Sequence, residues 1–380
     1  SFRLSRKYGG LKQGEPRISP PYFLDNLNEL ADVNYFDLPM LEKYIPVYSY
    51  SFGRKLRTLK VITGRGCPWN CTFCINSIFH LHHARHRVKS FDKIRREAEP
   101  VVRDFEIEDC SPRDDDFFSN RLLVDQWSQW AGERSLLWSA TARFNYIREG
   151  QVDVPRLREL SERGLYLLGM AVEAADEELR NRILNKKIMD RDIRRAVEII
   201  RDSRTGIAVN TSFVVYFPGD TEANRIGNIR WMEYLSRNLN VIFSGPQIYR
   251  SYPGTRLYGL EPDRLSGKLD YYLQNMAEDG SLFSKRPDDR NRMEFFSETL
   301  LSYFNTRFRK LERLPGARAV YPAGGGHFPV LGVVLKILFL PVRIRLRLNF
   351  WSCFIEAWLI GAVYRISTSC LRKAIRRVRR

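Results

Sequence analysis

The feature that most constrains the fold is a regular alternation of short β-rich runs with charged, helix-length segments, which begins near residue 59. Alternation at this spacing is typical of βαβ units, in which consecutive strands lie parallel and helices form the crossovers. It predicts an open (β/α)6 barrel or a doubly wound sheet. The expected strands are Leu59–Thr63, Phe105–Ile107, Leu136–Thr141, Tyr166–Val172, Ile207–Tyr216 and Val241–Tyr249. The expected helices include Phe91–Arg103, Val154–Arg163, Ile188–Ser203 and Thr221–Asn238.

Composition excludes several classes of protein. The 380 residues are 44% hydrophobic and 28% charged, which is ordinary for a globular protein and not for a disordered or collagen-like one. Six cysteines are too few for a disulfide scaffold. No run of 18 uncharged apolar residues predicts a membrane-spanning helix. The chain opens with Ser1 and without a signal-peptide pattern, so we expect a fragment or a processed chain in the cytoplasm.

Four segments follow from the distribution of proline, aromatic and basic residues. Residues 1–57 form a proline-interrupted linker with a short helix around Leu24–Leu30. Residues 58–265 form the α/β core. Residues 266–326 are polar and aromatic, and we expect them to form a helical extension. Residues 327–380 form a tail that is both basic and hydrophobic.

The tail holds much of the net charge of +18, because residues 343–380 contain ten Lys or Arg and one acidic residue. Its two apolar stretches, 327–342 and 348–363, are too short to span a bilayer, and each contains a charge. Apolar stretches bracketed by arginines fit a segment at an anionic membrane surface, which would place the protein peripherally at the inner membrane face. A helical cap on the core is the alternative. The tail is too apolar for us to expect a nucleic-acid partner.

The sequence GRGCPWNCTFC over residues 64–74 is the strongest motif, and it follows the first expected strand. Three cysteines on one loop, Cys67, Cys71 and Cys74, can point their sulfurs at one centre. Thiolates select zinc or iron–sulfur clusters, but a structural zinc site needs four protein ligands. Three ligands fit a [4Fe–4S] cluster with one open iron. The other cysteines are isolated in the sequence, at Cys110, Cys353 and Cys370.

This motif resembles the signature of the radical S-adenosylmethionine (radical SAM) enzymes, including an aromatic residue, Phe73, before the third cysteine. The likeness extends over about residues 35–260 and is strongest to the cobalamin-binding branch. It favours a partial (β/α)6 barrel of the TIM type, here with a helical C-terminal extension. Later segments that resemble the branch are Asp115–Asn120, Trp138 with Arg143, Ala171–Ala174, Phe217–Thr221 and Tyr252–Thr255.

The resemblance implies an enzyme whose three cysteines bind a [4Fe–4S] cluster and whose open iron binds SAM. Reductive cleavage of SAM would yield a 5′-deoxyadenosyl radical that abstracts hydrogen from an unactivated carbon. The implied reaction is C-methylation, cyclisation or rearrangement of a small-molecule or lipid substrate, including tetrapyrrole-like compounds. The implied electron donor is a reductant such as flavodoxin or ferredoxin.

The same likeness suggests SAM-binding residues outside the cysteines. Phe73 would pack near the SAM adenine, or it is simply a buried aromatic beside the loop. Asp115 and Asp116 would accept hydrogen bonds from the SAM ammonium, or they form a solvated acidic loop together with Asp114.

Glu173 stands in a largely apolar run, so a buried carboxylate there needs a partner. That partner is a hydroxyl or amino group of SAM, or it is Arg143. The Arg143 guanidinium would in turn bind the SAM carboxylate bidentately, or it pairs with Glu173.

Some features depart from the branch. Cys110–Arg113 looks like an insertion after the second expected strand, and Tyr216 replaces a usual glycine. No histidine precedes His80, so the branch's histidine-containing cobalamin element is absent, and we expect the cobalamin domain to be missing from this chain. The histidines that follow the cysteines fit no common zinc spacing, and we expect them in a loop or behind the ligands; they are His80, His82, His83 and His86.

Two other classes of function remain open from the sequence. One is a non-catalytic iron–sulfur protein for electron transfer or structure at a membrane. The other is a zinc-bound nucleic-acid module.

Overall fold

The computed structural model describes residues 24–41, 56–81, 86–215, 217–244, 247–249, 252 and 254–258. The predicted helical extension and basic tail lie outside these residues, as do His82 and His83. None of the helices in this part of the chain combines the length and hydropathy that a bilayer crossing requires.

The strands form the predicted open (β/α)6 barrel. β1 pairs in parallel with β4, and β5, β6, β7 and β9 form a parallel sheet in that order. An isolated parallel bridge between Asp109 and Leu137 links β4 to β5. β8 extends the line of β7 and pairs in parallel with β10, while β2 and β3 form a small antiparallel ribbon. The strands are β1 Thr58–Val61, β2 Gly64–Arg65, β3 Arg87–Val88, β4 Asp109–Pro112, β5 Trp138–Thr141, β6 Leu165–Gly169, β7 Ala208–Thr211, β8 Val214–Val215, β9 Asn240–Phe243 and β10 Gln247–Ile248.

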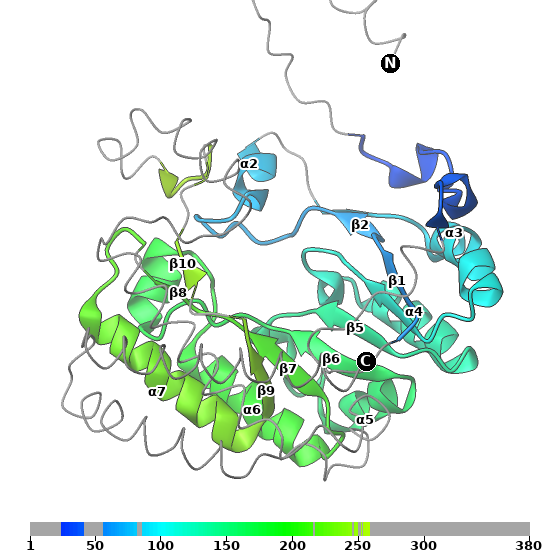
Figure 1. Ribbon diagram of the computed structural model, residues 1–380. Helices are drawn as coiled ribbons and strands as arrows, with labels where there is room; N and C mark the ends of the chain where they lie inside the picture. The colour runs from blue at the N-terminus through cyan, green and yellow to red at the C-terminus, as the bar shows by residue number, and fades with distance from the viewer. Residues whose placement is uncertain are drawn as a thin grey trace, which may run out of the picture.

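Helices α3 to α7 follow the outer side of this curved sheet, from α3 beside β1 to α7 beside β9 (Figure 1). The bounds of α3, α5, α6 and α7 lie within two residues of the four predicted helices. The helices are α2 Asn76–Leu81, α3 Phe91–Asp104, α4 Arg121–Glu133, α5 Val154–Glu162, α6 Asp190–Ser203 and α7 Glu222–Asn238. Single helical turns are η1 Leu27–Glu29, η2 Tyr35–Asp37, η3 Phe117–Ser119 and η4 Phe144–Tyr146, and η5 Leu179–Ile183 is a π-helical turn.

The predicted second strand at Phe105–Ile107 is wrong. The Phe105 backbone N–H caps α3 by donating to the Val101 carbonyl at 3.0 Å, and Glu106 turns the chain with φ 47°. The strand is β4, two residues further on, and the supposed insertion at Cys110–Arg113 is that strand and its end. Its sequence Asp-Cys-Ser-Pro has low strand propensity, so pairing with neighbours on both sides decides its conformation.

The two faces of the barrel differ in polarity. Strand residues on the outer face, such as Leu59, Cys110 and Trp138, belong to the main apolar core with the helices. Alternate residues face the interior, and several are polar: Thr58, Lys60, Asp109, Ser111, Ser139, Thr141 and Asn210. Other positions on this side are apolar, because Ala208 packs with Leu137, Tyr166 and Leu167. Parallel sheets covered on both faces are normally apolar on both, so the polar positions of this interior are suited to a polar ligand.

Parallel strands end at one rim, and in barrels of this type that carboxyl rim carries the active site. The segments after β1, β4, β5 and β6 carry the cysteine loop, Asp114–Asp116, Arg143 and Glu173 respectively. The fold therefore gathers the residues that the sequence analysis selected.

Candidate active site

The start of the cysteine loop is fixed by Asp114. The backbone N–H groups of Thr63 and Gly64 donate to Asp114 Oδ1 at 2.7 and 3.0 Å, and the Thr63 hydroxyl donates to Oδ2. Gly64 is required here because a Cβ would lie 2.9 Å from the Arg87 carbonyl oxygen. Asp114 is thus a buried anchor of the loop and not part of a solvated acidic segment.

The middle of the loop is tied to the segment after β6. Thr72 donates from its backbone N–H to the Leu184 carbonyl at 3.1 Å and from its hydroxyl to the Ile183 carbonyl at 2.6 Å. The Asn185 side-chain amide donates to the Asn70 carbonyl at 2.6 Å. These contacts hold the cysteines in place without using their sulfurs.

Each of the three sulfurs is free of disulfides and has a polar neighbour. Cys67 Sγ lies 3.8 Å from Asp116 Oδ2, Cys71 Sγ lies 3.9 Å from Arg143 Nη1, and Cys74 Sγ lies 3.7 Å from Asn76 Nδ2. Hydrogen bonds to sulfur ligands help to set the potential of an iron–sulfur cluster. Arg143 and Asn76 are suited to that role.

The donor set fits a cluster. Burial raises the pKa of the Cys67 thiol to about 12, with a further contribution from the Asp116 carboxylate, and burial also raises the pKa of Cys74. A bound metal centre would supply the positive charge that deprotonates them. In the described part of the chain, no three Cys, His, Asp or Glu side chains converge closely enough for a single metal ion. A four-iron cluster separates its ligand sulfurs more widely than one ion does.

Asp116 is the acidic residue that the fold buries beside the sulfurs. Its Oδ2 accepts from the Tyr146 hydroxyl at 2.8 Å, and that hydroxyl accepts from Trp69 Nε1 at 2.6 Å. Its Oδ1 is buried without a hydrogen-bond partner. Burial raises the pKa of Asp116 to about 6. Asp115 is exposed, so the structure separates the two carboxylates that the sequence analysis treated together.

Arg143 is buried at the centre of the site. Its guanidinium stacks over the Trp69 ring with 4.0 Å between Cζ and the ring centroid, and Nη2 donates to the Lys186 carbonyl. Among the described residues Glu173 forms its ion pair with Lys186 and not with Arg143, so the predicted alternative of an Arg143–Glu173 ion pair is wrong. The guanidinium instead lies between the cysteine loop and the segment after β6.

The partner of Glu173 is Lys186, which the sequence analysis missed. Lys186 Nζ lies 2.8 Å from Glu173 Oε1, and both side chains are about nine-tenths buried. Burial is the largest single influence on the pKa of Lys186 and lowers it, but the Glu173 carboxylate and the Cys71 sulfur together leave that pKa raised. Glu173 has φ 73°, a left-handed conformation that is rare for a non-glycine residue and often marks a functional site.

An irregular segment brings Lys186 to Glu173. Asn185 and Lys187 both have positive φ, and the fully buried Arg180 donates to the carbonyls of Ala174 and Ile188 at 2.9 and 2.8 Å. The available sequence signal was the Asn-Lys-Lys triplet before a helix, which has no periodicity that would predict burial.

The remaining predicted residues lie around the loop. Phe73 packs against a small apolar cluster that includes Leu184, Phe217 and Leu257. His80 Nε2 lies 2.8 Å from the Cys67 carbonyl oxygen, which places it behind a cysteine as expected. His86 Nδ1 lies 3.3 Å from the Ser119 hydroxyl.

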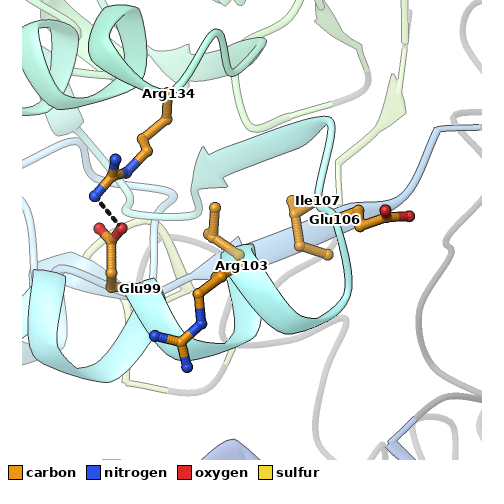
Figure 2. Close-up of a pocket in the computed structure, with 6 residues that line it drawn as sticks. Glu99, Arg103, Glu106, Ile107 and Arg134 are labelled. Carbon is orange, nitrogen blue, oxygen red and sulfur yellow. Dashed lines mark ion pairs between the residues drawn. The ribbon is translucent and has the colours of Figure 1, made fainter.

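A separate cleft with a volume of about 530 Å³ lies away from this site (Figure 2). It is formed by the end of α3, the turn before β4 and the end of α4, at the amino ends of the strands. Figure 2 shows Glu99 and Arg134 paired beside it, at 2.5 Å. Its lining residues are Glu99, Val102, Arg103, Glu106, Ile107 and Arg134.

The fold and the site define a class: an open (β/α)6 barrel with three free cysteines on the loop after its first strand. The model of the radical SAM superfamily matches residues 61–232, which include this loop and the strands that surround it. This segment therefore resembles the radical SAM superfamily, and it contains Cys67, Cys71 and Cys74.

Two curated relatives match much of the chain. An uncharacterized methyltransferase of Pyrococcus horikoshii is 26% identical over 257 residues, which cover 67% of this chain and 50% of the relative. The ribosomal protein uS12 methylthiotransferase RimO of Clostridioides difficile is 23% identical over 211 residues, covering 54% of this chain and 44% of the relative. The chain thus spans about half the length of these relatives.

Among solved structures, the chain is similar to the radical S-adenosylmethionine methyltransferase TsrM from Kitasatospora setae. The TM-score is 0.43 with 16% sequence identity, over 53% of this chain and 36% of that one. The TsrM structure has cobalamin and a [4Fe–4S] cluster bound.

Proposed function

We propose that the chain is the catalytic part of a radical SAM enzyme that methylates, cyclises or rearranges an unactivated carbon substrate. When bound, the cluster supplies the electron that cleaves SAM to methionine and a 5′-deoxyadenosyl radical. The observation that carries the proposal is the meeting of three free cysteine sulfurs with Asp116, Arg143 and Glu173 at one rim of the barrel.

In this proposal, Cys67, Cys71 and Cys74 hold the cluster. The unpartnered Asp116 Oδ1 accepts from the SAM ammonium, because it is a buried acceptor beside Cys67. Arg143 binds the SAM carboxylate, for which a planar guanidinium is well suited.

Glu173, held by Lys186, accepts from a hydroxyl or amino group of SAM through its remaining carboxylate oxygen. Phe73 packs near the adenine. Exposed Asp115 has a weaker claim to a SAM contact than Asp116.

Methyl transfer is the leading reaction, because the Pyrococcus relative is named a methyltransferase. Cobalamin would then be a third cofactor beside the cluster and SAM, held by a part of the protein other than the residues described. A reductant such as flavodoxin or ferredoxin would supply electrons. A peripheral membrane location and a lipid or tetrapyrrole-like substrate depend on residues 327–380.

The test is the fate of SAM. The full chain is reconstituted anaerobically with iron and sulfide and given dithionite and SAM, and 5′-deoxyadenosine is quantified by mass spectrometry. We expect time-dependent 5′-deoxyadenosine from the wild type and none from Cys74→Ala. Cys110→Ala is the matched control, because Cys110 lies in β4 within the apolar core. A fully loaded cluster without 5′-deoxyadenosine would refute the proposal and favour an electron-transfer or structural role.

A second measurement separates methyl transfer from other radical reactions. With reduced cobalamin added, S-adenosylhomocysteine together with methylcobalamin would support methyl transfer. Formation of 5′-deoxyadenosine alone would favour cyclisation or rearrangement.

A further inference from the structure

Two cations, Lys60 and Arg113, stand near the carboxyl ends of β1 and β4. Lys60 on β1 faces the interior, because its neighbours Leu59 and Val61 pack in the outer core. Arg113 immediately follows β4 and extends the side of that strand occupied by Asp109 and Ser111. The two cations are close enough that Arg113 acts to lower the pKa of Lys60, although burial is the larger cause of that lowering.

The acidic residue beside Lys60 is Asp109, and it already forms an ion pair with Lys60. It is fully buried, and its Oδ2 accepts from Lys60 Nζ at 2.9 Å and from the Tyr166 hydroxyl at 3.2 Å. The Thr58 and Ser111 hydroxyls also donate to this carboxylate. Asp109 therefore neutralises Lys60.

Arg113 is exposed, and no acidic side chain of the described residues forms an ion pair with it. Two like charges close together repel each other, so placing Arg113 near the partly buried Lys60 does not by itself stabilise the fold. It is a suitable arrangement for binding an anion, because Arg and Lys donors bind carboxylate and phosphate through charge-assisted hydrogen bonds.

A hydrogen-bond acceptor, Asn210 Oδ1, stands at the strand position that corresponds in register to Arg113. Asp109 pairs with Leu137, so Arg113 lies level with Thr141, and Thr141 is in register with Gly169 and then Asn210. Gly169 places no side chain between them. Asn210 Oδ1 is buried without a hydrogen-bond partner, which points to a donor that a bound molecule would supply.

We propose that Lys60 and Arg113 bind a carboxylate or phosphate group of the substrate at the carboxyl rim of the barrel, and that Asn210 accepts a hydrogen bond from the same molecule. The anion site stands on the charges and contacts above, whereas calling its ligand the substrate rests on the proposed radical SAM function. Arg113 directly precedes Asp114–Asp116, so the site adjoins the place proposed for SAM. The substrate class is accordingly a polar acid rather than a neutral lipid.

The test measures how anions protect Arg113 from the arginine reagent phenylglyoxal. The full chain with its cluster reconstituted is labelled in inorganic phosphate, in acetate or in chloride, at constant ionic strength, and modified peptides are quantified by mass spectrometry. The midpoint is the anion concentration that halves the rate at which Arg113 is labelled. At ten times that concentration, mass action predicts labelling of Arg113 about 10-fold slower than in chloride. Arg121, an exposed arginine at the start of α4, is the internal control and should label at one rate throughout.

Variants of Lys60 test whether both cations act on one anion. Lys60→Gln should raise the midpoint for protection of Arg113 about tenfold or more, because a charge-assisted hydrogen bond is lost. Lys60→Arg should retain protection. Far-UV circular dichroism and the rate at Arg121 report whether each variant is folded.

Protection by phosphate alone identifies the anionic group as a phosphate, and protection by acetate alone identifies it as a carboxylate. Protection by both supports a site that binds either group. Equal labelling of Arg113 in all three salts, or undiminished protection in Lys60→Gln, overturns the proposal. 5′-Deoxyadenosine is measured on the same preparation. Its absence would refute the radical SAM activity while leaving the protection result to decide the anion site independently.

Discussion

Replacing Lys186 by methionine tests the structural logic of the site most directly. The substitution preserves most of the side-chain volume and removes the charge that lies 2.8 Å from the Glu173 carboxylate. The two side chains are 11% and 8% exposed, so solvent screens this pair little. Removing one member of a buried ion pair leaves an uncompensated charge, which typically destabilises a protein by about 3–5 kcal/mol. We expect a loss of that size in the free energy of unfolding.

The assay is urea unfolding of the cluster-free protein at neutral pH, followed by circular dichroism. The raised pKa of Lys186 means that its stabilising charge is fully present below pH 10 and is lost only as the pH rises through that raised value. With an m-value of about 2–3 kcal/mol/M, the transition midpoint should fall by about 1–2 M.

Lys187→Met is the matched control, because Lys187 is the adjacent lysine, is exposed and also has positive φ. It should change stability by no more than about 0.5 kcal/mol. The double variant Glu173→Gln/Lys186→Met should regain at least half of the loss, since it no longer buries a charge. A change below about 1 kcal/mol in Lys186→Met would refute the claim that this buried pair supports the site.

Three further predictions follow from the same contacts. Asp114→Ala should lower the free energy of unfolding in urea by about 3 kcal/mol, because two backbone N–H groups and the Thr63 hydroxyl lose a charged acceptor. The control is Asp115→Ala, at an exposed residue, which should leave the free energy of unfolding nearly unchanged. Equal effects of the two substitutions would contradict the anchoring role of Asp114. Gly227→Ala should cost about 1–3 kcal/mol in thermal unfolding, because its Cβ would lie 2.8 Å from Ala175 Cβ, and an unchanged melting temperature would show that α7 can shift freely. Removing iron with a chelator should abolish formation of 5′-deoxyadenosine. The barrel should still unfold cooperatively, because the three cysteines lie outside the main apolar core. Loss of the far-UV circular dichroism signal on chelation would show that the cluster supports the fold.

Much of the fold was predictable because the signals were local. The boundaries of α3, α5, α6 and α7 follow from amphipathic periodicity and from caps such as Ser90 and Asp153. The strand predicted at Phe105–Ile107 lies instead at β4. The apolar run 105–107 ends a helix, and the true strand has a polar sequence that does not look like a strand. That polar sequence faces the interior, where the usual preference of parallel strands for apolar residues does not hold.

The site was predictable in part. The spacing of Cys67, Cys71 and Cys74 restricts them to one loop, so the sequence could select them as ligands of a single centre. Lys186 could not be selected, because its approach to Glu173 depends on two residues with positive φ and on contacts of the buried Arg180. No periodicity in the sequence encodes such a turn.

By itself, the sequence determined the α/β class, the order of its elements and the three cysteines, because each depends on residues near one another along the chain. Only the tertiary structure decided the roles of the three adjacent aspartates: Asp114 anchors a loop, Asp115 meets solvent and Asp116 is buried beside a cysteine. It also decided that Lys60 on β1 pairs with Asp109 on β4. Burial and charge pairing depend on which strands become neighbours, and for strands with helices between them that is settled by the packing of the whole barrel.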